Sequence, residues 1–509
     1  MLIKSQPDEI QNYLFDASYV QGGHAARVMF PETGGDVAAI LAEATRTETP
    51  VTVSGAGTGT VAGRVPFGGI VIATDKLNSL QSIVRENSGG RAQAEAGVRL
   101  FDLQKAADAD GLLYPPDPTE RSCFIGGNIS TNASGARTFK YGPTRNYVAA
   151  LRVALTTSDV IEIRRGQFHA GKDGRIHLPL TSGGAIEAQL PSYRMPRVRK
   201  HASGYYVAPE MDLIDLFIGS EGTLGVIVAA ELKLLPKPEG LLSGVVFFAR
   251  EDNLLAFVGD ARERSLANRV RSPTVREGNA DKNAGLDARA LEYLDLESLR
   301  FLRQKYDTIP DQAMGAIFFE QETTASTEDE LMNEWLSLLE SHQAMADRSW
   351  FATNEQDQAG LREFRHALPV LMNEWFSQHQ QRKVSTDMAV PDAQFAGMLR
   401  FYQESLRHGD LRYTIFGHIG DNHVHVNILP RNDAEAEKAW AIYRTFIRRA
   451  VEVGGTISAE HGIGKLKREY LRELYGDSHL REMAKLKLAF DPAGILGRGN
   501  MFDEEFLVK

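Results

Sequence analysis

The sequence predicts an α+β protein with two domains. Segments with the period-two alternation of strands are interspersed with segments that have the helical spacing of apolar residues. A chain of 509 residues also exceeds what one hydrophobic core supports. The character of the sequence changes near residue 240, after Pro236 and Pro238. We therefore expect one domain over residues 1–238 and a second over residues 239–509.

Composition restricts the class of protein. A hydrophobic share of 43% and a charged share of 24% are typical of a globular protein with a large core. The net charge of −10 argues against a nucleic-acid partner. The single cysteine, Cys123, excludes an internal disulfide and a four-cysteine metal or iron–sulfur site. Because we find neither a signal peptide nor a spanning segment, we expect a cytoplasmic protein, at most peripheral to the inner membrane.

In the first half, capping and alternation predict the elements. Thr33 is placed to cap a helix, with Asp36 three residues later, and the apolar face of this helix consists of Val37, Ile40, Leu41 and Ala44. Residues 50–77 then predict a strand, a glycine-rich loop and a second strand. Strand alternation follows in YVAALRVALTTSDVIEI, and a turn plus a strand in DLFIGSEGTLGVIVAAELKLLPKP.

The second half alternates between strands and amphipathic helices. Strands are predicted for GLLSGVVFFA and MGAIFFEQE. Helices are predicted for LMNEWLSLLESH, AQFAGMLRFYQESLRHG and EAEKAWAIYRTFIRRAVEVGG, the last of which ends at glycines.

A basic stretch occupies residues 164–200. It contains only Asp173 and Glu187 as acidic residues, and its basic residues are Arg164, Arg165, Lys172, Arg175, Arg194, Arg197, Arg199 and Lys200. Its glycines and prolines predict a long exposed loop. A solvated insertion is one interpretation, and docking of an acidic electron acceptor or an anionic membrane surface is the other.

The first glycine-rich loop, SGAGTGT, has features of a Rossmann fingerprint, since it follows a strand and Asp75 lies about twenty residues later. A Rossmann loop must open a helix. Here the glycines and the proline of VAGRVPFGG leave no room for one. Successive backbone amides without Cβ atoms can still bind phosphate, and a structural tight turn is the alternative.

Two further tracts are rich in small residues. One is PPDPTERSCFIGGNISTNASGARTFKYGPTRNYV, and the other is GSEGTLG at residues 219–225. Glycine, serine and asparagine suit places where the backbone approaches a flat ligand closely. Together the tracts favour a cofactor site.

Five motifs in order connect the chain to a flavoprotein superfamily. PVTVSGAGTGTVAG, PPDPTERSCFIGGNISTNASGA and LFIGSEGTLGVI resemble the FAD domain of the vanillyl-alcohol oxidase and p-cresol methylhydroxylase (PCMH) superfamily. FGHIGDNHVHVNI and GTISAEHGIGK narrow the resemblance to the FAD-linked D-2-hydroxy acid dehydrogenases, which include D-lactate, glycolate and D-2-hydroxyglutarate dehydrogenases. The resemblance extends from about residue 25 to residue 502.

The resemblance implies a fold. Residues 1–238 would form a PCMH-type FAD-binding domain of two α+β subdomains, with an exposed basic insertion at about residues 164–200. Residues 239–509 would form the C-terminal FAD-linked oxidase domain, which binds substrate and metal and has an antiparallel sheet flanked by helices. The last segment, from about residue 450, would return toward the flavin.

The resemblance also implies the FAD contacts. The pyrophosphate loop would be Ser54, Gly55, Ala56, Gly57, Thr58 and Gly59. The flavin, ribityl and adenosine parts would pass Pro116, Asp117, Thr119, Gly126, Gly127, Asn128, Ser130, Thr131, Asn132 and Gly135. The adenine side would be completed by Glu221, Gly222, Gly225 and Val226.

Two features of this chain modify that implication. Some superfamily members attach FAD covalently through a histidine of the first loop, but this loop has neither histidine nor cysteine, so we expect noncovalent FAD. Gly497 and Arg498 stand where the family commonly has asparagine and proline. We therefore expect a contact near the flavin to be made differently here.

The stretch FGHIGDNHVHVNI combines histidines with a turn. Residues 420–422 are turn formers, so YTIFGHI and HVHVNIL can form a hairpin that brings His418 and His425 together. With Glu460 as a third ligand, Zn²⁺ or Mn²⁺ would keep open positions. A polar hairpin without metal is the alternative. The resemblance places these three residues on the family's metal ligands.

The resemblance assigns three further roles. His461 would be the general base, and a histidine pKa suits that role. Asn427 would contact the substrate. Arg365 would bind the substrate carboxylate, and a surface salt bridge on a helix is the alternative. His423 is not counted as a ligand; it would be an additional group near the site or a partner of the backbone.

A substrate preference follows from one position. Ser385 stands where dicarboxylate-specific relatives have a lysine, and Lys383 lies two residues away. This favours a substrate with a single carboxylate, such as lactate, over D-2-hydroxyglutarate.

We therefore predict a dehydrogenase that oxidises a D-2-hydroxy acid, D-lactate in the first place, to the 2-oxo acid by metal-assisted hydride transfer to FAD. The sequence lacks a ligand set for haem or an iron–sulfur cluster, so electrons would leave to a quinone, a cytochrome or an electron-transfer flavoprotein. A homodimer is expected. The alternatives are an FAD oxidase for another alcohol or phenol and a flavin electron-transfer subunit of a larger complex.

Overall fold

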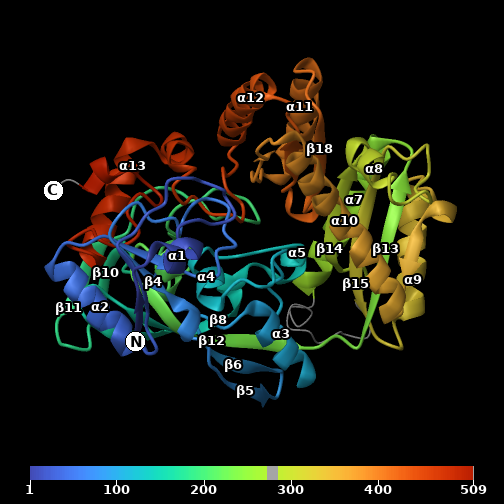
Figure 1. The fold of residues 1–509 in the computed structure, drawn as a ribbon. Coiled ribbons are helices and arrows are strands. Elements are labelled where there is room, and N and C mark those ends of the chain that lie inside the picture. The colour runs from blue at the N-terminus through green and yellow to red at the C-terminus, as the bar shows by residue number, and fades with distance from the viewer. Residues whose placement is uncertain (272–284, 508–509) are drawn as a thin grey trace.

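The computed structural model describes residues 1–271 and 285–507. In Figure 1 the N-terminal half lies on the left and a helix-flanked sheet on the right, while the red C-terminal segment returns to the left. The predicted α+β class is confirmed. The predicted second domain, 239–509, includes residues 272–284 and 508–509, which lie outside the described residues.

The first sheet has the strand order β1-β2-β4-β3. These strands are β1 (Leu2–Lys4), β2 (Arg27–Phe30), β3 (Val51–Ser54) and β4 (Ile70–Ala73), and a short helix, α1 (Pro7–Ile10), follows β1. Helix α2 (Gly34–Arg46) packs on this sheet and begins with the predicted capping box of Thr33 and Asp36. Strands β3 and β4 are parallel, and residues 55–69, all of them described, form no helix between them, as predicted.

The second sheet is antiparallel and has six strands. The strands are β5 (Leu80–Glu86), β6 (Gly89–Glu95), β7 (Leu112–Leu113), β8 (Val148–Ala154), β9 (Val160–Arg164) and β12 (Val226–Pro236). Between them lie the helices α3 (Leu100–Ala109), α4 (Ile125–Ser130), α5 (Thr138–Tyr141) and α6 (Ile214–Phe217). The two small-residue tracts predicted from the sequence therefore become loops and short helices beside β12.

The third sheet has seven strands in the order β16-β13-β15-β14-β18-β19-β17. The strands are β13 (Gly240–Phe248), β14 (Ala288–Asp295), β15 (Gly315–Thr323), β16 (Trp350–Ala352), β17 (Val384–Ser385), β18 (Tyr413–Gly417) and β19 (His425–Ile428). The accompanying helices are α7 (Glu251–Arg271), α8 (Leu296–Leu302), α9 (Glu328–Ser341), α10 (Glu355–His379), α11 (Phe395–His408) and α12 (Asp433–Glu452). All neighbouring strands are antiparallel.

Helix α10 was not among the predicted helices, and it contains Pro369 in its interior. A proline removes one backbone hydrogen bond and normally bends or ends a helix. Here Phe364, Leu368 and Met372 are buried on one face of α10, so tertiary packing outweighs the local cost.

The prediction of a long exposed loop at residues 164–200 is wrong. Strands β10 (Arg175–Pro179) and β11 (Ala185–Gln189) form a hairpin in which Ile176, Leu178 and Ile186 are buried. At the end of the stretch Lys200 is also buried. Alternation of apolar and charged residues within the basic stretch gives this hairpin one inward face.

The C-terminal segment lies against the N-terminal half. Helix α13 (Arg468–Phe490) contacts β11, and in Figure 1 it lies on the left with the N-terminal half. Farther on, the Val51 amide donates to the carbonyl of Ile495, and Gly497 donates back to Val51. Among the described residues, no helix has the length and apolarity needed to cross a bilayer.

Candidate functional site

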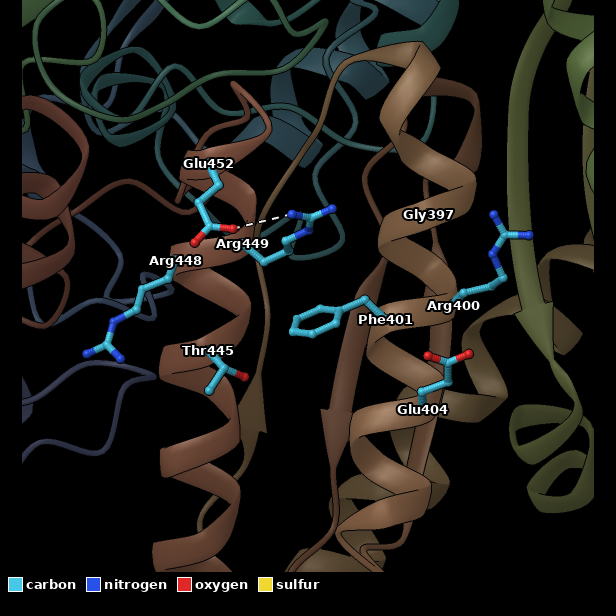
Figure 2. A pocket seen from close by; sticks show the side chains of 8 residues that line it. All are labelled: Gly397, Arg400, Phe401, Glu404, Thr445, Arg448, Arg449 and Glu452. Atoms are coloured by element: carbon cyan, nitrogen blue, oxygen red, sulfur yellow. Dashed lines mark hydrogen bonds and ion pairs between the residues drawn. The ribbon is translucent and has the colours of Figure 1, made fainter.

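An open groove between α11 and α12 is not the candidate site. Figure 2 shows that Arg400 and Arg448 point away from each other on its two sides. Arg449 contacts Glu452, and Arg448 contacts Glu473. The groove therefore has no set of converging chemical groups.

A second cavity is formed by the three glycine-rich tracts. The predicted cofactor residues that line it are Gly55, Ala56, Gly57, Thr58, Gly59, Gly126, Gly127, Asn128, Ser130, Thr131, Glu221, Gly222, Gly225 and Val226. A Cβ added at Gly59 or Gly127 would meet only open space. At Gly126 it would come within 2.7 Å of the Ala96 side chain. The backbone thus approaches the cavity closely, and these residues fit an elongated cofactor such as FAD.

The other predicted cofactor residues do not line this cavity. Ser54 Oγ accepts a hydrogen bond from Arg64, and Asp117 lies 3.5 Å from Arg137. Pro116 is buried and its carbonyl accepts from Gln104, while Thr119 is exposed. Asn132 Oδ1 accepts from the Arg145 amide, and Gly135 lies against the Asp117 carbonyl, where a Cβ would come within 2.0 Å.

Several cavity residues were not predicted as cofactor contacts. They are Asp16, Val53, Val61, Gly63, Arg64, Thr74, Cys123, Phe124 and Ile227. His461, predicted as the general base, also lines the cavity. Arg64 ties the loop to the N-terminal segment, since it donates to the carbonyls of Asn12, Phe15 and Gly55. No local pattern marks Arg64 or Asp16, because their place depends on the path of residues 12–17. Burial raises the pKa of the Cys123 thiol to about 12.

The predicted histidine hairpin is present. Strands β18 and β19 pair across a turn at residues 419–421. Gly420 packs against the Phe139 ring, where a Cβ would come within 2.9 Å. The turn therefore also joins the two halves of the molecule.

Imidazole nitrogens converge on one oxygen of Glu460. The Nε2 atoms of His418, His425 and His461 lie 3.4, 3.2 and 3.8 Å from Glu460 Oε1. His425 Nδ1 lies 3.0 Å from the Thr386 carbonyl, which leaves Nε2 as an acceptor. Ligand atoms of His418, His423, His425 and Glu460 fall within 4.8 Å of one another, so these residues fit a divalent ion.

Glu292, which was not predicted, connects two predicted residues. Its Oε1 lies 2.6 Å from His418 Nδ1, and its Oε2 accepts from Arg365 at 3.1 and 3.2 Å. Burial alone would raise the pKa of Glu292, but His418 and Arg365 lower it to about 2. Arg365 therefore lies at the cluster, held by a carboxylate that also orients His418.

Asp387 holds the loop that contains His461. It accepts from the amides of Glu460 and His461, and its Oδ2 lies 3.4 Å from His461 Nδ1. Burial lowers the pKa of His461 to about 4, against the opposing charges of Asp387 and Glu460. At neutral pH His461 is therefore an uncharged imidazole that can accept a proton.

His423 faces the same carboxylate. Its Nε2 lies 3.2 Å from Asp387 Oδ1, and burial lowers the pKa of His423 to about 3. His423 therefore lies beside the predicted ligands, and its imidazole faces Asp387.

The remaining predicted residues lie on the adjoining strands. Asn427 is buried, and its Oδ1 accepts no hydrogen bond from the described residues. Ser385 is its register partner on β17, and Lys383 is exposed. The C-terminal stretch that contains Gly497 and Arg498 reaches the cavity residues. The Arg498 guanidinium donates to the Gly494 carbonyl, and Asn500 Nδ2 donates to the carbonyls of Gly63 and Glu221.

Comparison with known families agrees with this arrangement. Residues 25–164 match the FAD binding domain, and residues 279–501 match the C-terminal domain of FAD linked oxidases. The first match spans the first glycine-rich loop and α4, and the second contains the histidine hairpin and Glu460.

Individual relatives match nearly the whole chain. A D-lactate dehydrogenase of Anaerostipes hadrus is 30% identical over 97% of this chain and 93% of its own. The glycolate oxidase subunit GlcD of Bacillus subtilis is 29% identical over 97% of this chain and 92% of its own. A D-2-hydroxyglutarate dehydrogenase of Stutzerimonas stutzeri is 26% identical over 93% of this chain and 90% of its own.

A solved structure shares the fold. An alkyldihydroxyacetonephosphate synthase superimposes with a TM-score of 0.65 at 14% identity, over 97% of this chain and 82% of its own.

Proposed function

This chain belongs to the FAD-linked D-2-hydroxy acid dehydrogenase family of flavoproteins with a PCMH-type FAD-binding domain, and on that premise we propose that it oxidises D-lactate, or a similar D-2-hydroxy acid, to the 2-oxo acid. One observation carries the proposal. His461 lines the glycine-rich cavity and also lies 3.8 Å from Glu460, so the cofactor cavity and the histidine cluster share a residue.

Different residues of this chain have different roles in the proposed reaction. The glycine-rich cavity would hold FAD, which would supply the redox chemistry as a hydride acceptor. His418, His425 and Glu460 would hold a Zn²⁺ or Mn²⁺ ion, which would supply Lewis-acid polarisation of the substrate hydroxyl. His461 Nε2 takes the hydroxyl proton as the hydride leaves the substrate Cα. Arg365 binds the substrate carboxylate and fixes its orientation, and Asn427 Oδ1 offers an unused acceptor.

We propose noncovalent FAD. The first loop has no histidine or cysteine, and the cavity thiol of Cys123 has a pKa raised to about 12 by burial. A thiol that stays protonated is a poor nucleophile, which supports the absence of a covalent link.

The preference for D-lactate rests on Ser385. It is neutral and pairs with Asn427 on the neighbouring strand. A second substrate carboxylate would thus lack a cation at this position.

As parts of the same proposal, we expect a cytoplasmic homodimer, peripheral contact with the inner membrane, and a quinone, a cytochrome or an electron-transfer flavoprotein as acceptor.

Anaerobic flavin bleaching tests the proposal. The FAD-loaded protein would be mixed with D-lactate, L-lactate, glycolate, D-malate and D-2-hydroxyglutarate, before and after chelator treatment. We expect fastest bleaching with D-lactate, loss of bleaching with chelator, and recovery with Zn²⁺ or Mn²⁺. Faster bleaching by D-2-hydroxyglutarate would contradict the preference. An oxidised flavin with every acid, in metal-replete protein, would favour the electron-transfer subunit.

A further inference from the structure

The two carboxylate oxygens of Glu460 have different surroundings. Oε1 faces the imidazole nitrogens of the histidine cluster. Oε2 lies 3.2 Å from Lys200 Nζ and 3.3 Å from Ser134 Oγ. The carboxylate therefore has one side for the predicted ion and another side held by hydrogen-bond donors.

Lys200 reaches Glu460 from the end of the basic stretch. Its side chain is 0% exposed, and its Nζ donates to the Gly135 carbonyl at 2.9 Å. A second carboxylate, Asp421, lies farther away at 3.7 Å. Among the described residues, the shortest carboxylate contact of Lys200 is thus to a predicted metal ligand.

A comparison with another buried lysine shows why this contact is unusual. Lys140 Nζ lies 2.7 Å from Glu322 and 3.1 Å from Asp287, so two carboxylates at close range neutralise it. A buried charge is costly unless it is paired in this way. Lys200 has one close carboxylate, and that carboxylate also faces an ion site, so stability alone is a poor explanation for its position.

We propose that Lys200 is a positioning residue that restricts Glu460 to coordination through Oε1 alone. The inference rests on the proposed function, because it requires an ion at the histidine cluster. With Oε2 bonded to Lys200 and Ser134, one oxygen remains for the ion, which leaves a further coordination position for a substrate oxygen. The positive charge also withdraws electron density from the carboxylate, so the ion remains a stronger Lewis acid.

The same contacts fix the position of the histidine cluster relative to the cofactor cavity. Ser134 and Gly135 continue the small-residue tract that lines the cavity at Ser130 and Thr131. Gly135 is held in close contact with the Asp117 carbonyl, so its own carbonyl gives Lys200 a fixed acceptor. Lys200 therefore connects the predicted FAD tract with a predicted metal ligand.

Lys200→Met tests this inference, because methionine has similar length and no charge. In the FAD-loaded variant we expect Zn²⁺ affinity, measured by chelator competition, to rise at least about tenfold, since a positive charge near the ion is removed. X-ray absorption should show one additional oxygen neighbour of Zn²⁺, and kcat should fall. The control Lys140→Met removes a buried lysine that contacts other carboxylates, and its Zn²⁺ affinity should match the wild type.

A folded Lys200→Met variant with unchanged or weaker Zn²⁺ affinity would overturn the inference. Should this variant fail to retain FAD, Ser134→Ala decides the question, because it removes only the hydroxyl from Oε2. We expect a smaller rise in Zn²⁺ affinity for Ser134→Ala, and the absence of a rise would contradict the inference. A wild-type protein that binds no divalent ion would overturn the metal part of the proposed function as well, which separates the two failures.

Discussion

The cofactor cavity and the histidine cluster meet at His461 but are built by different means. The cavity is lined largely by backbone from three short tracts, in which glycines leave space at positions such as Gly59 and Gly127. The cluster is built from ionisable side chains, in which Glu460 and Glu292 each contact several partners. The cavity therefore depends on the absence of side chains at particular positions, whereas the cluster is a buried polar network in which the loss of one partner leaves others unpaired.

Glu460→Gln should have the largest effect, because it removes the charge on which the imidazoles converge. We expect loss of bound metal and of hydroxy-acid turnover, with FAD retained in the separate cavity. Elemental analysis and the flavin spectrum measure the two properties in one sample. The control Glu452→Gln alters an exposed carboxylate on α12 and should change neither. Turnover by a metal-free Glu460→Gln variant would remove the proposed role of the ion.

His461→Asn should slow flavin reduction by about 10²-fold or more, the usual cost of losing a general base. His461 is not one of the proposed metal ligands and is one of many residues that line the cavity, so metal and FAD content should stay near the wild-type level. Stopped-flow bleaching under anaerobic conditions measures the rate. His408→Asn, an exposed change at the end of α11, serves as the control. An unaltered rate would assign the proton transfer to another group.

Glu292→Gln should weaken metal binding by about 10- to 100-fold, as is typical when the partner of a metal-binding histidine is lost. A neutral amide can accept from His418 or from Arg365, and it presents its NH₂ group to the other. The KM for the hydroxy acid should therefore rise together with the metal Kd. The control Glu297→Gln changes a carboxylate paired with Arg300 on α8. A changed KM with normal metal affinity would limit the role of Glu292 to Arg365.

Gly127→Ala should have the smallest effect of the four. Its added Cβ meets no protein atom and enters space at the cavity, so we expect about tenfold weaker FAD binding without a loss of apoprotein stability. Fluorescence titration of apoprotein with FAD measures the affinity. Gly360→Ala, at a helical glycine with equal space, should leave FAD binding unchanged. Equal FAD affinity in both variants would place the cofactor away from α4.

Features that depend on neighbouring residues could be predicted from the sequence, whereas contacts between distant segments could not. The capping box of α2, the loop between β3 and β4 and the hairpin of β18 and β19 follow from local patterns, and the structure has all three. The pairing of Glu292 with Arg365, and of Asp387 with the loop at His461, joins segments more than 70 residues apart. Local periodicity contains no information about such pairs, so Glu292, Asp387 and Lys200 were found only in the structure.

The composition of residues 164–200 was also misleading. Its glycines and prolines led to the prediction of an exposed loop, yet the stretch contains the hairpin of β10 and β11 and ends in buried Lys200. Composition ignores the alternation of polar residues with Ile176 and Leu178, which gives the strand an inward face.

Glu221 has a consequence for engineering by recombination. It lines the cofactor cavity, and its carboxylate accepts the amides of Ile463 and Gly464, which belong to the distant C-terminal segment. A single exchange of segments between homologues at residue 240 would therefore separate residues that contact each other at the cavity. A chimera that takes the first 238 residues from one parent should keep residues 455–502 from the same parent. Glu221 and the backbone amides that it accepts would then come from one protein.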